Sequence, residues 1–250
     1  MLPVSEIFYS FQGEGEFIGT PSVFLRLGGC NLKCIGFGIK NSYEGNTILG
    51  CDSIYAANGH FSKEWKSYDS SQILIDKIQN FSSNKFDIVI TGGEPSLHFK
   101  NPVLLKTIEY FLQKGHRISI ESNGSIDFVF NDILKELHFT LSIKLSNSGE
   151  SYSKRIKTKV IQNIIDNAKS VVFKFVLNAQ MCENGTALKE IEELLKTLKL
   201  KSNKIYLMPQ GISRKELDEN IKKIYPICLQ KGFCLSDRLH IRIWGNKRGV

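Results

Sequence analysis

No stretch of the 250-residue chain is both long and apolar, and its first residues, MLPVSEIFYS, contain no basic segment ahead of a hydrophobic one. The first absence excludes a membrane-spanning helix and the second a secretory signal, so we expect a cytoplasmic protein. No internal repeat, low-complexity tract or linker divides the sequence, which favours one domain. With 42% hydrophobic and 23% charged residues, the composition is globular, which excludes disorder and a collagen-like fibre.

Positive charge exceeds negative charge, but it is scattered. The net charge of +8 permits weak attraction to anions and suggests, as one alternative, a basic RNA-binding or zinc-binding module. The lysines of residues 189–201 are interleaved with glutamates, as on a solvated helix face, and no platform of aromatic and basic residues is visible. We therefore expect no nucleic-acid and no membrane partner.

The six cysteines are too sparse for a secreted disulfide scaffold, which is shorter and denser in cysteine. Three of them lie close together in GGCNLKC…GCDS, namely Cys30, Cys34 and Cys51. Three thiolates around a [4Fe–4S] cluster leave one iron open for a substrate or cofactor, whereas zinc needs a fourth ligand, for which His60 is a candidate. The triplet by itself leaves a cluster, a zinc site and three buried structural cysteines as alternatives.

Short β-branched runs alternate with helical patterns along the chain. Strands are predicted at residues 23–27, 86–91, 117–121, 139–143, 170–177, 204–208 and 239–244. Most are continuous apolar runs, as in strands that are buried on both faces of a parallel sheet. About six such repeats indicate an α/β fold, a single-domain incomplete (βα)6-type parallel barrel.

Helix boundaries are marked by capping residues. Asn101 precedes a proline and is predicted to cap a helix, and Ser213 with Glu216 fits a capping box. Pro226 is predicted to break or restart the helix that follows Ser213. Residues 35–50, rich in Gly, Asn and Ser, are predicted to form a loop insertion.

Glycine and small polar residues follow several predicted strands, in RLGGC, TGGEP, ESNG, IKLSNSG and MPQG. In parallel barrels the active site lies where strands end and loops begin. Glycine at these positions lets a ligand approach the backbone closely. We therefore expect one functional site built from these loops.

A series of short blocks runs in order along nearly the whole chain: FQGEG, RLGGCNLKC, CDSIYA, TGGEPSL, IESNGS, LSIKLSNSG, FKFV, LMPQG and HIRIWGNKRGV. In these blocks the sequence resembles the 7-carboxy-7-deazaguanine synthases, a family of radical S-adenosylmethionine enzymes. The resemblance implies a radical S-adenosylmethionine domain over residues 1–250, with the insertion at about 35–50. It also implies a lyase that converts 6-carboxy-5,6,7,8-tetrahydropterin to 7-carboxy-7-deazaguanine by radical ring contraction with loss of ammonia, in the biosynthesis of a queuosine precursor.

Another small radical enzyme is the nearest alternative, such as an activase that generates a glycyl radical on a partner protein. It would share the cysteines and TGGEP, but it would not need FQGEG or the WGNKRGV ending. The family resemblance further implies a homodimer and an electron donor such as flavodoxin.

The resemblance also implies how the cofactors are bound. The family binds a [4Fe–4S] cluster through CxxxCxxC; Cys30 and Cys34 match its first two cysteines, but strict spacing puts Phe37 at the third. Cys51, followed by Asp52-Ser53 where the family has Asp-Thr, is therefore assigned as the third ligand beyond the insertion. S-adenosylmethionine is expected at the residues that match the family's glycine-rich, Ser-Pro-Lys and neighbouring motifs, namely Gly50, Asp52, Gly92, Gly93, Glu94, Ser142, Ile143, Lys144 and Gln210.

The implied substrate carries a carboxylate and a guanidine-like edge. Arg26 is suited to bind the carboxylate because its planar guanidinium donates two parallel hydrogen bonds. The hydroxyl of Ser53 replaces the family's threonine and is expected to bind a magnesium ion beside the substrate. The implied substrate contacts, with the family's final carboxylate at Val250, are Phe11, Gln12, Gly13, Glu14, Arg26, Thr91, Glu121 and Val250.

Overall fold

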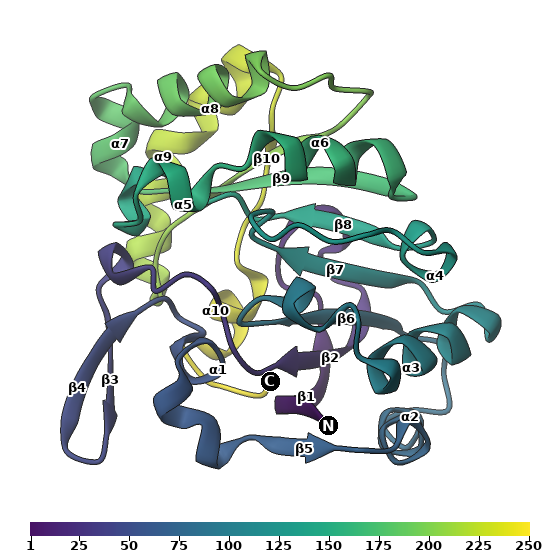
Figure 1. The fold of residues 1–250 in the computed structure, drawn as a ribbon. Coiled ribbons are helices and arrows are strands. Elements are labelled where there is room, and N and C mark those ends of the chain that lie inside the picture. Colours follow the sequence, from purple (N-terminus) through teal and green to yellow (C-terminus); the bar gives the residue numbers. More distant parts are fainter.

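A nine-stranded sheet forms the centre of the computed structural model, which describes residues 1–250 (Figure 1). The strand order is β11-β10-β9-β8-β7-β6-β2-β1-β5; all neighbours from β2 to β11 are parallel, and β1 pairs antiparallel with β2 and β5. The strands are β1 (Leu2–Phe11), β2 (Pro21–Leu27), β5 (Lys66–Tyr68), β6 (Asp87–Gly92), β7 (Ile118–Ser122), β8 (His138–Leu141), β9 (Ser170–Leu177), β10 (Ile205–Pro209) and β11 (Cys234–Leu235). A separate two-stranded hairpin consists of β3 (Ile39–Tyr43) and β4 (Asn46–Gly50).

Six of the seven predicted strands are confirmed, and they are the strands from β2 to β10 of the parallel part. They are mostly apolar because helices cover one face and buried side chains fill the other. The order is that of a (βα)6 barrel, and β11 and β5 stay at opposite edges, so the barrel is incomplete. The α/β prediction is therefore confirmed.

Helices connect the strands and pack on the outside of the sheet (Figure 1). The long ones are α2 (Ser71–Gln79), α3 (Pro102–Gln113), α6 (Thr158–Asn167), α8 (Thr186–Lys196) and α9 (Arg214–Lys231). The short ones are α1 (Ile54–Ala57), α4 (Asp132–Lys135), α5 (Tyr152–Arg155), α7 (Ala179–Glu183) and α10 (Leu239–Trp244). No helix is long and apolar enough to cross a membrane.

The predicted caps of two helices are confirmed. The Asn101 side chain accepts a hydrogen bond from the Val103 N–H, and Ser213 and Glu216 form the complete capping box. The prediction for Pro226 is wrong, because α9 continues through it. Ile224 and Cys228 are buried on either side of this proline, so packing against the sheet outweighs one missing backbone hydrogen bond.

Two further predictions are wrong, and one long strand was not predicted. Residues 239–244 form α10, not a strand, and β1 was not predicted at all. Residues 35–50 are not a loop: they fold into a 3₁₀ turn and the hairpin β3–β4. Glu44 and Gly45 join its strands with φ of 48° and 79°, the positive values of a two-residue type I′ turn, which the Glu-Gly sequence signals only weakly.

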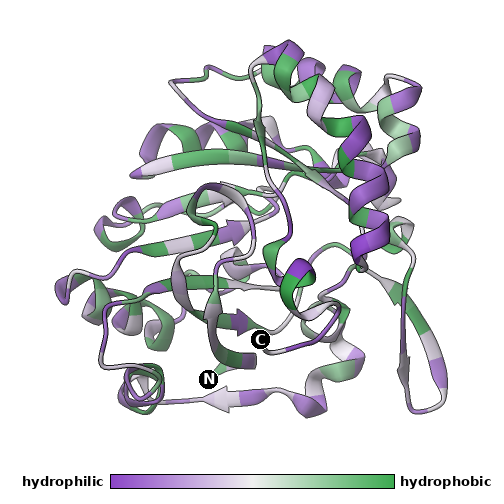
Figure 2. Ribbon diagram, turned by 180° about the vertical axis from the view of Figure 1, so that it is seen from behind, coloured by the Kyte–Doolittle hydropathy of each residue, from purple (hydrophilic) through white to green (hydrophobic).

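One continuous cluster of buried side chains spans the sheet and its covering helices, with Phe111, Phe139, Phe173 and Phe175 among its largest members. Figure 2 shows hydrophobic residues along the strands, whereas the long helices carry hydrophilic residues on their outer faces. The parallel strands end on the side of the sheet where the hairpin and α10 lie (Figure 1). The loops that follow these strands, which the sequence analysis singled out, therefore lie close together.

Candidate active site

A cavity of about 690 Å³ lies at the carboxyl ends of the parallel strands. Its size is in the range of small-molecule sites. It is lined by the ends of β1, β2, β6, β7, β9 and β10, by the hairpin, by α10 and by residues 246–250. Most of the predicted site residues line it: Phe11, Gln12, Gly13, Glu14, Arg26, Cys30, Cys34, Cys51, Asp52, Ser53, Thr91, Gly92, Gly93, Glu121, Ser142, Lys144, Gln210 and Val250.

The three cysteines of the N-terminal triplet border this cavity from two loops. Cys30 follows β2, and Cys34 adopts a left-handed conformation with φ of 49°. Cys51 follows the last strand of the hairpin. Glu150 holds the loop in place, since its carboxylate accepts hydrogen bonds from the N–H groups of Lys33 (2.5 Å) and Cys34 (3.0 Å).

All three thiols are free, and burial raises their pKa, in Cys30 and Cys51 to about 12. They are therefore neutral until a metal displaces the proton. They line one cavity, and no three His, Cys, Asp or Glu side chains are grouped so that they could hold a single metal ion. A [4Fe–4S] cluster needs separate thiolates on different irons, and the three cysteines are of the residue type that supplies them. His60 does not line the cavity and hydrogen-bonds Asn58 instead, so it offers no fourth zinc ligand.

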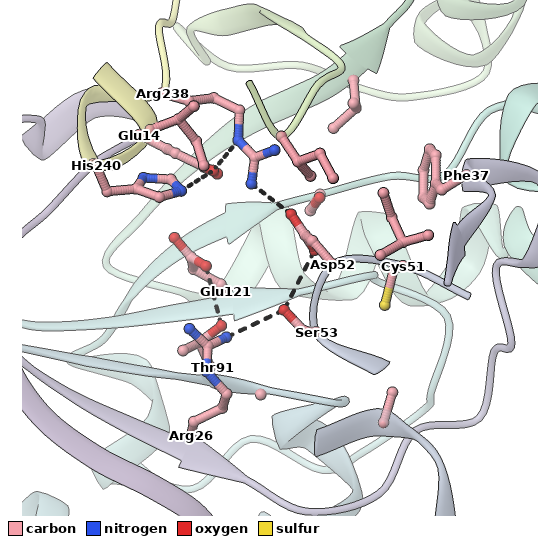
Figure 3. Close-up of a pocket in the computed structure, with 18 of the residues that line it drawn as sticks. Glu14, Arg26, Phe37, Cys51, Asp52, Ser53, Thr91, Glu121, Arg238 and His240 are labelled. Carbon is pink, nitrogen blue, oxygen red and sulfur yellow. Dashed lines mark hydrogen bonds and ion pairs between the residues drawn. The ribbon is translucent and has the colours of Figure 1, made fainter. Parts of the chain in front are cut away.

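The 3₁₀ turn between Cys34 and the hairpin places a new side chain at the cavity. Phe37, at the position of strict third-cysteine spacing, turns its ring toward the cavity near Cys51 (Figure 3). The turn before the hairpin is anchored at Gly36, where a Cβ would lie 2.4 Å from the Asn147 carbonyl oxygen. Only glycine fits between these two backbones, so the insertion is docked against the loop after β8.

The two glycines of TGGEP are required by close packing of backbones. A Cβ on Gly92 would lie 2.2 Å from the Leu27 carbonyl oxygen, and one on Gly93 would lie 1.9 Å from that of Gly29. The loops after β2 and β6 therefore touch directly, and both glycines border the cavity.

Glu94 does not line the cavity, contrary to the expectation that its side chain meets the cofactor. It is fully buried, and its carboxylate accepts hydrogen bonds from the Ser96 N–H (3.0 Å), the Ser122 hydroxyl (2.8 Å) and the Asn123 N–H (2.7 Å). Its role in this structure is to join the loops after β6 and β7.

The Ser142–Lys144 motif divides between cavity and core. Lys144 Nζ donates hydrogen bonds to the Ser142 hydroxyl (2.8 Å) and carbonyl (3.0 Å), and both residues line the cavity. Ile143 is buried in the core, and Gly50 is buried against Ile54, so neither borders the cavity. Gln210 lines the cavity and accepts a hydrogen bond from the Asn147 amide (3.2 Å).

Arg26, Ser53, Thr91 and Glu121 face the cavity from the other side (Figure 3). Arg26 donates through Nε to Glu6 (2.8 Å) and through Nη1 to the Ser53 hydroxyl (3.3 Å). The Thr91 hydroxyl donates to Glu121 (3.0 Å). One wall of the cavity thus contains the Arg26 guanidinium, two hydroxyl groups and the Glu121 carboxylate.

A charged network, of which the sequence predicted only Glu14 and Asp52 as site residues, forms another wall of the cavity. Glu14 pairs with Lys174 (2.5 Å) and Arg238 (2.9 Å), and Arg238 also pairs with Asp52 (Figure 3). Lys174 lies in the middle of the apolar strand β9 and is only 4% exposed. The lysine within this apolar run was a signal in the sequence that an acidic partner must lie nearby, because an unpaired charge is not tolerated in a buried strand.

The network holds its charges firmly. Burial alone would raise the pKa of the Glu14 carboxyl, but the charges of Lys174 and Arg238 outweigh burial and hold it well below its usual range. Burial opposes the charged form of Lys174, yet Glu121 and Glu14 hold its pKa above the usual value. Burial lowers the pKa of His240, so this ring, which faces Glu14, is neutral near pH 7.

Comparison with known proteins supports the family resemblance. No family model matches the chain. It is 32% identical to a 7-carboxy-7-deazaguanine synthase of Rhodopirellula baltica over 257 residues, which covers 100% of this chain and 89% of that protein. Its fold is similar to that of QueE from Escherichia coli, with a TM-score of 0.67, 24% identity, and 96% and 94% of the two chains covered. It is also similar to anSMEcpe with bound AdoMet, with a TM-score of 0.50, 15% identity, and 86% and 61% covered.

An incomplete parallel barrel with three cysteines and a Gly-Gly loop at its carboxyl end defines a radical S-adenosylmethionine enzyme. Within that class, the chain belongs to the 7-carboxy-7-deazaguanine synthase family. It is thus a lyase of queuosine precursor biosynthesis, and this reading is favoured over the glycyl-radical activase. Membership implies S-adenosylmethionine and a [4Fe–4S] cluster as cofactors.

Proposed function

We propose that the cavity binds 6-carboxy-5,6,7,8-tetrahydropterin between Arg26 and the Glu14 network, with the cofactors at the cysteine and Gly-Gly loops. The observation that carries this proposal is that residues from nine separate segments, matched to the family by sequence alone, line one cavity. When bound, the cluster and S-adenosylmethionine supply the one-electron chemistry that starts ring contraction. The protein's own residues bind and orient the substrate.

The cluster is assigned to Cys30, Cys34 and Cys51. All three residues line the same cavity. S-adenosylmethionine is assigned to the adjacent polar surface, with Gly92 and Gly93 presenting backbone groups. The remaining polar contacts come from Asp52, Ser142, Lys144 and Gln210.

The substrate is assigned to the opposite side. Arg26 keeps its Nη2 group free of protein partners, and this group is available to the substrate carboxylate. Glu121 already accepts hydrogen bonds from Thr91 and, at 3.3 Å, from Gln12, so it presents a fixed carboxylate to the guanidine-like edge. The other substrate-facing residues are Phe11, Gly13, Glu14 and Val250.

A magnesium ion is proposed at Ser53. Its hydroxyl faces the cavity 3.4 Å from Asp52 Oδ1, so two hard oxygen donors lie together, as magnesium prefers. Ser53→Thr is expected to keep the magnesium requirement of turnover and Ser53→Ala to raise it about tenfold or more. Product formation against magnesium concentration measures this, and identical curves for all three proteins would exclude Ser53 as a ligand.

The wider setting is proposed from the same features. Residues 1–250 form one domain, supported by a single buried core. Six free cysteines fit the reducing cytoplasm. A flavodoxin-type electron donor and a homodimer are proposed from the family, and the exposed Tyr225 and Leu229 on α9 offer apolar surface for a second copy. Size-exclusion chromatography with light scattering tests the dimer.

Anaerobic turnover tests the proposed function. Reconstituted protein receives S-adenosylmethionine, a reductant, magnesium and 6-carboxytetrahydropterin, and mass spectrometry follows 7-carboxy-7-deazaguanine. Cys51→Ala is expected to lose product and iron, whereas the control Cys182→Ala, which lies outside the cavity, keeps both. If S-adenosylmethionine is cleaved without product, the substrate assignment is wrong. If Cys51→Ala retains its cluster, the third ligand is elsewhere.

A further inference from the structure

Glu6 is a partly buried carboxylate next to a residue of the cavity lining, Arg26, without lining the cavity itself. It lies on β1 directly opposite Arg26 on β2, next to an irregularity in strand pairing between Val4 and Glu6. Its side chain is 15% exposed and does not line the cavity. It accepts hydrogen bonds from Arg26 Nε (2.8 Å), the Tyr55 hydroxyl (2.7 Å) and Arg248 Nε (3.2 Å).

These contacts set the plane of the Arg26 guanidinium. Glu6 binds its Nε edge, and the hydroxyl of Ser53 binds Nη1. The rings of Phe8 and Tyr55 lie over it, each with its centroid 5.8 Å from the guanidinium carbon. Because one edge is occupied, only the remaining N–H groups are left to meet a ligand, and they do so in one orientation.

The same carboxylate holds residues 246–250, which line the cavity. Arg248 stacks on the Tyr55 ring at 3.5 Å and pairs with Glu6. Its side chain is 46% exposed. The contacts with Glu6 and Tyr55 attach the Arg248 side chain to the rest of the molecule.

Two guanidiniums share the Glu6 carboxylate in this arrangement, and the charges of Glu6 and Glu121 both favour the charged form of Arg26. The Nη2 group of Arg26 has no protein partner, so it is left to an anionic ligand group. The substrate carboxylate is such a group, given the proposed role of Arg26, on which this inference rests.

We propose that Glu6 is a positioning residue for two elements that face the substrate. It fixes the orientation of the Arg26 guanidinium and the position of the 246–250 segment. Glu6 does not touch the substrate. It orients Arg26 for the carboxylate and, through Arg248 and Tyr55, holds the segment over the cavity.

The first test is kinetic and uses the reconstituted holoenzyme. Glu6→Gln keeps the shape of the side chain but loses its charge, so it is expected to raise the pterin KM between about tenfold and a hundredfold. Its kcat should stay within about threefold, and its cluster absorbance and S-adenosylmethionine affinity should be unchanged. Glu192→Gln, which removes a surface partner of Lys231, is the matched control and keeps the wild-type KM. A loss confined to kcat would overturn the proposal.

The second test measures how firmly the 246–250 segment is held and does not depend on enzyme activity. Trypsin cleavage after Lys247 is followed by intact mass, and Glu6→Gln and Arg248→Ala are expected to be cleaved at least about fivefold faster than wild type and Glu192→Gln. Arg248→Lys, which restores charge without the planar stack, should give an intermediate rate. Equal cleavage rates in all variants would overturn the proposed attachment.

Arg26→Lys separates this inference from the proposed function. If Arg26→Lys raises KM while Glu6→Gln changes neither KM nor cleavage, Arg26 binds the substrate but Glu6 does not position it. A different result is that Glu6→Gln accelerates cleavage while Arg26→Lys leaves KM unchanged. Glu6 then holds the 246–250 segment, but Arg26 does not bind the substrate carboxylate. The proposal that Glu6 orients Arg26 for the substrate is then wrong as well.

Discussion

Charged residues around the cavity are constrained mainly by the opposite charges that they neutralise. Glu14 is the clearest example, since it compensates Lys174 from β9 and Arg238 from the segment before α10, and it faces His240 on α10. Removing one partner of a buried charged pair leaves the other without solvent or counter-charge. The identity of these residues therefore matters to folding as well as to substrate binding.

Acidification should expose the contribution of Glu14. The pKa of its carboxyl in the folded protein is lowered from 4.5, so its stabilisation is complete above about pH 4.5 and is lost as the pH falls toward the folded pKa. Glu14→Gln is expected to lower the unfolding free energy by about 3–5 kcal/mol at pH 7. It should also make the unfolding free energy fall less steeply as the pH is lowered. Urea unfolding of the cluster-free protein between pH 3 and pH 7 measures both. Parallel acid limbs in the variant and wild type would contradict this role.

Gly93 should tolerate no side chain. A Cβ there would lie 1.9 Å from the Gly29 carbonyl oxygen, a backbone atom that cannot move aside alone. Gly93→Ala is expected to lose at least about 3 kcal/mol of unfolding free energy. Gly59→Ala is the control, because no atom lies within 4 Å of its added Cβ. Thermal denaturation of both variants, followed by circular dichroism, checks the contrast.

Helices and strands in this protein follow local sequence signals unless packing opposes them. The buried strands from β2 to β10 and the caps of α3 and α9 follow such signals. Residues 239–244 alternate like a strand but form α10, because the preceding loop directs them onto the end of β1, where the Leu239 N–H donates to the Gly13 carbonyl. Packing also keeps α9 continuous across Pro226.

Pro226 therefore weakens the helix in which it lies. It is exposed, and it lacks the N–H that would complete the backbone ladder of α9. Pro226→Ala is expected to raise the unfolding free energy by about 1–3 kcal/mol. Urea denaturation measures the change. A decrease would mean that the rigid proline stabilises by restricting the unfolded chain, and not that it weakens the helix.

The whole molecule is closed by contacts between distant parts of the chain. Arg238 binds Glu14 at the end of β1, Asp52 after the hairpin and the Gly211 carbonyl after β10. One guanidinium thus connects the segments after β1, after the hairpin and after β10 around the cavity, as the planar five-donor group of arginine allows.

Loss of Arg238 should destabilise the whole fold. Arg238→Ala leaves Glu14 and Asp52 without their shared partner and is expected to cost about 3–5 kcal/mol. Arg242→Ala removes the more exposed neighbour that pairs with Asp218 and Asp237, and it should cost about 1 kcal/mol or less. Urea unfolding of both proteins measures the difference, and equal losses would show that Arg238 acts only locally.

The sequence by itself determined the order of the parallel strands, the loops that carry the chemistry and the family, because apolar runs, glycines and short motifs are local patterns. It did not determine that Glu94 turns away from the cavity, that residues 35–50 form a hairpin, or that Lys174, Arg238, Glu6 and Arg248 belong to the site. Those outcomes depend on which side chains meet across long separations in the chain. Buried charges must find partners in three dimensions, and only the tertiary structure decides which partners they find.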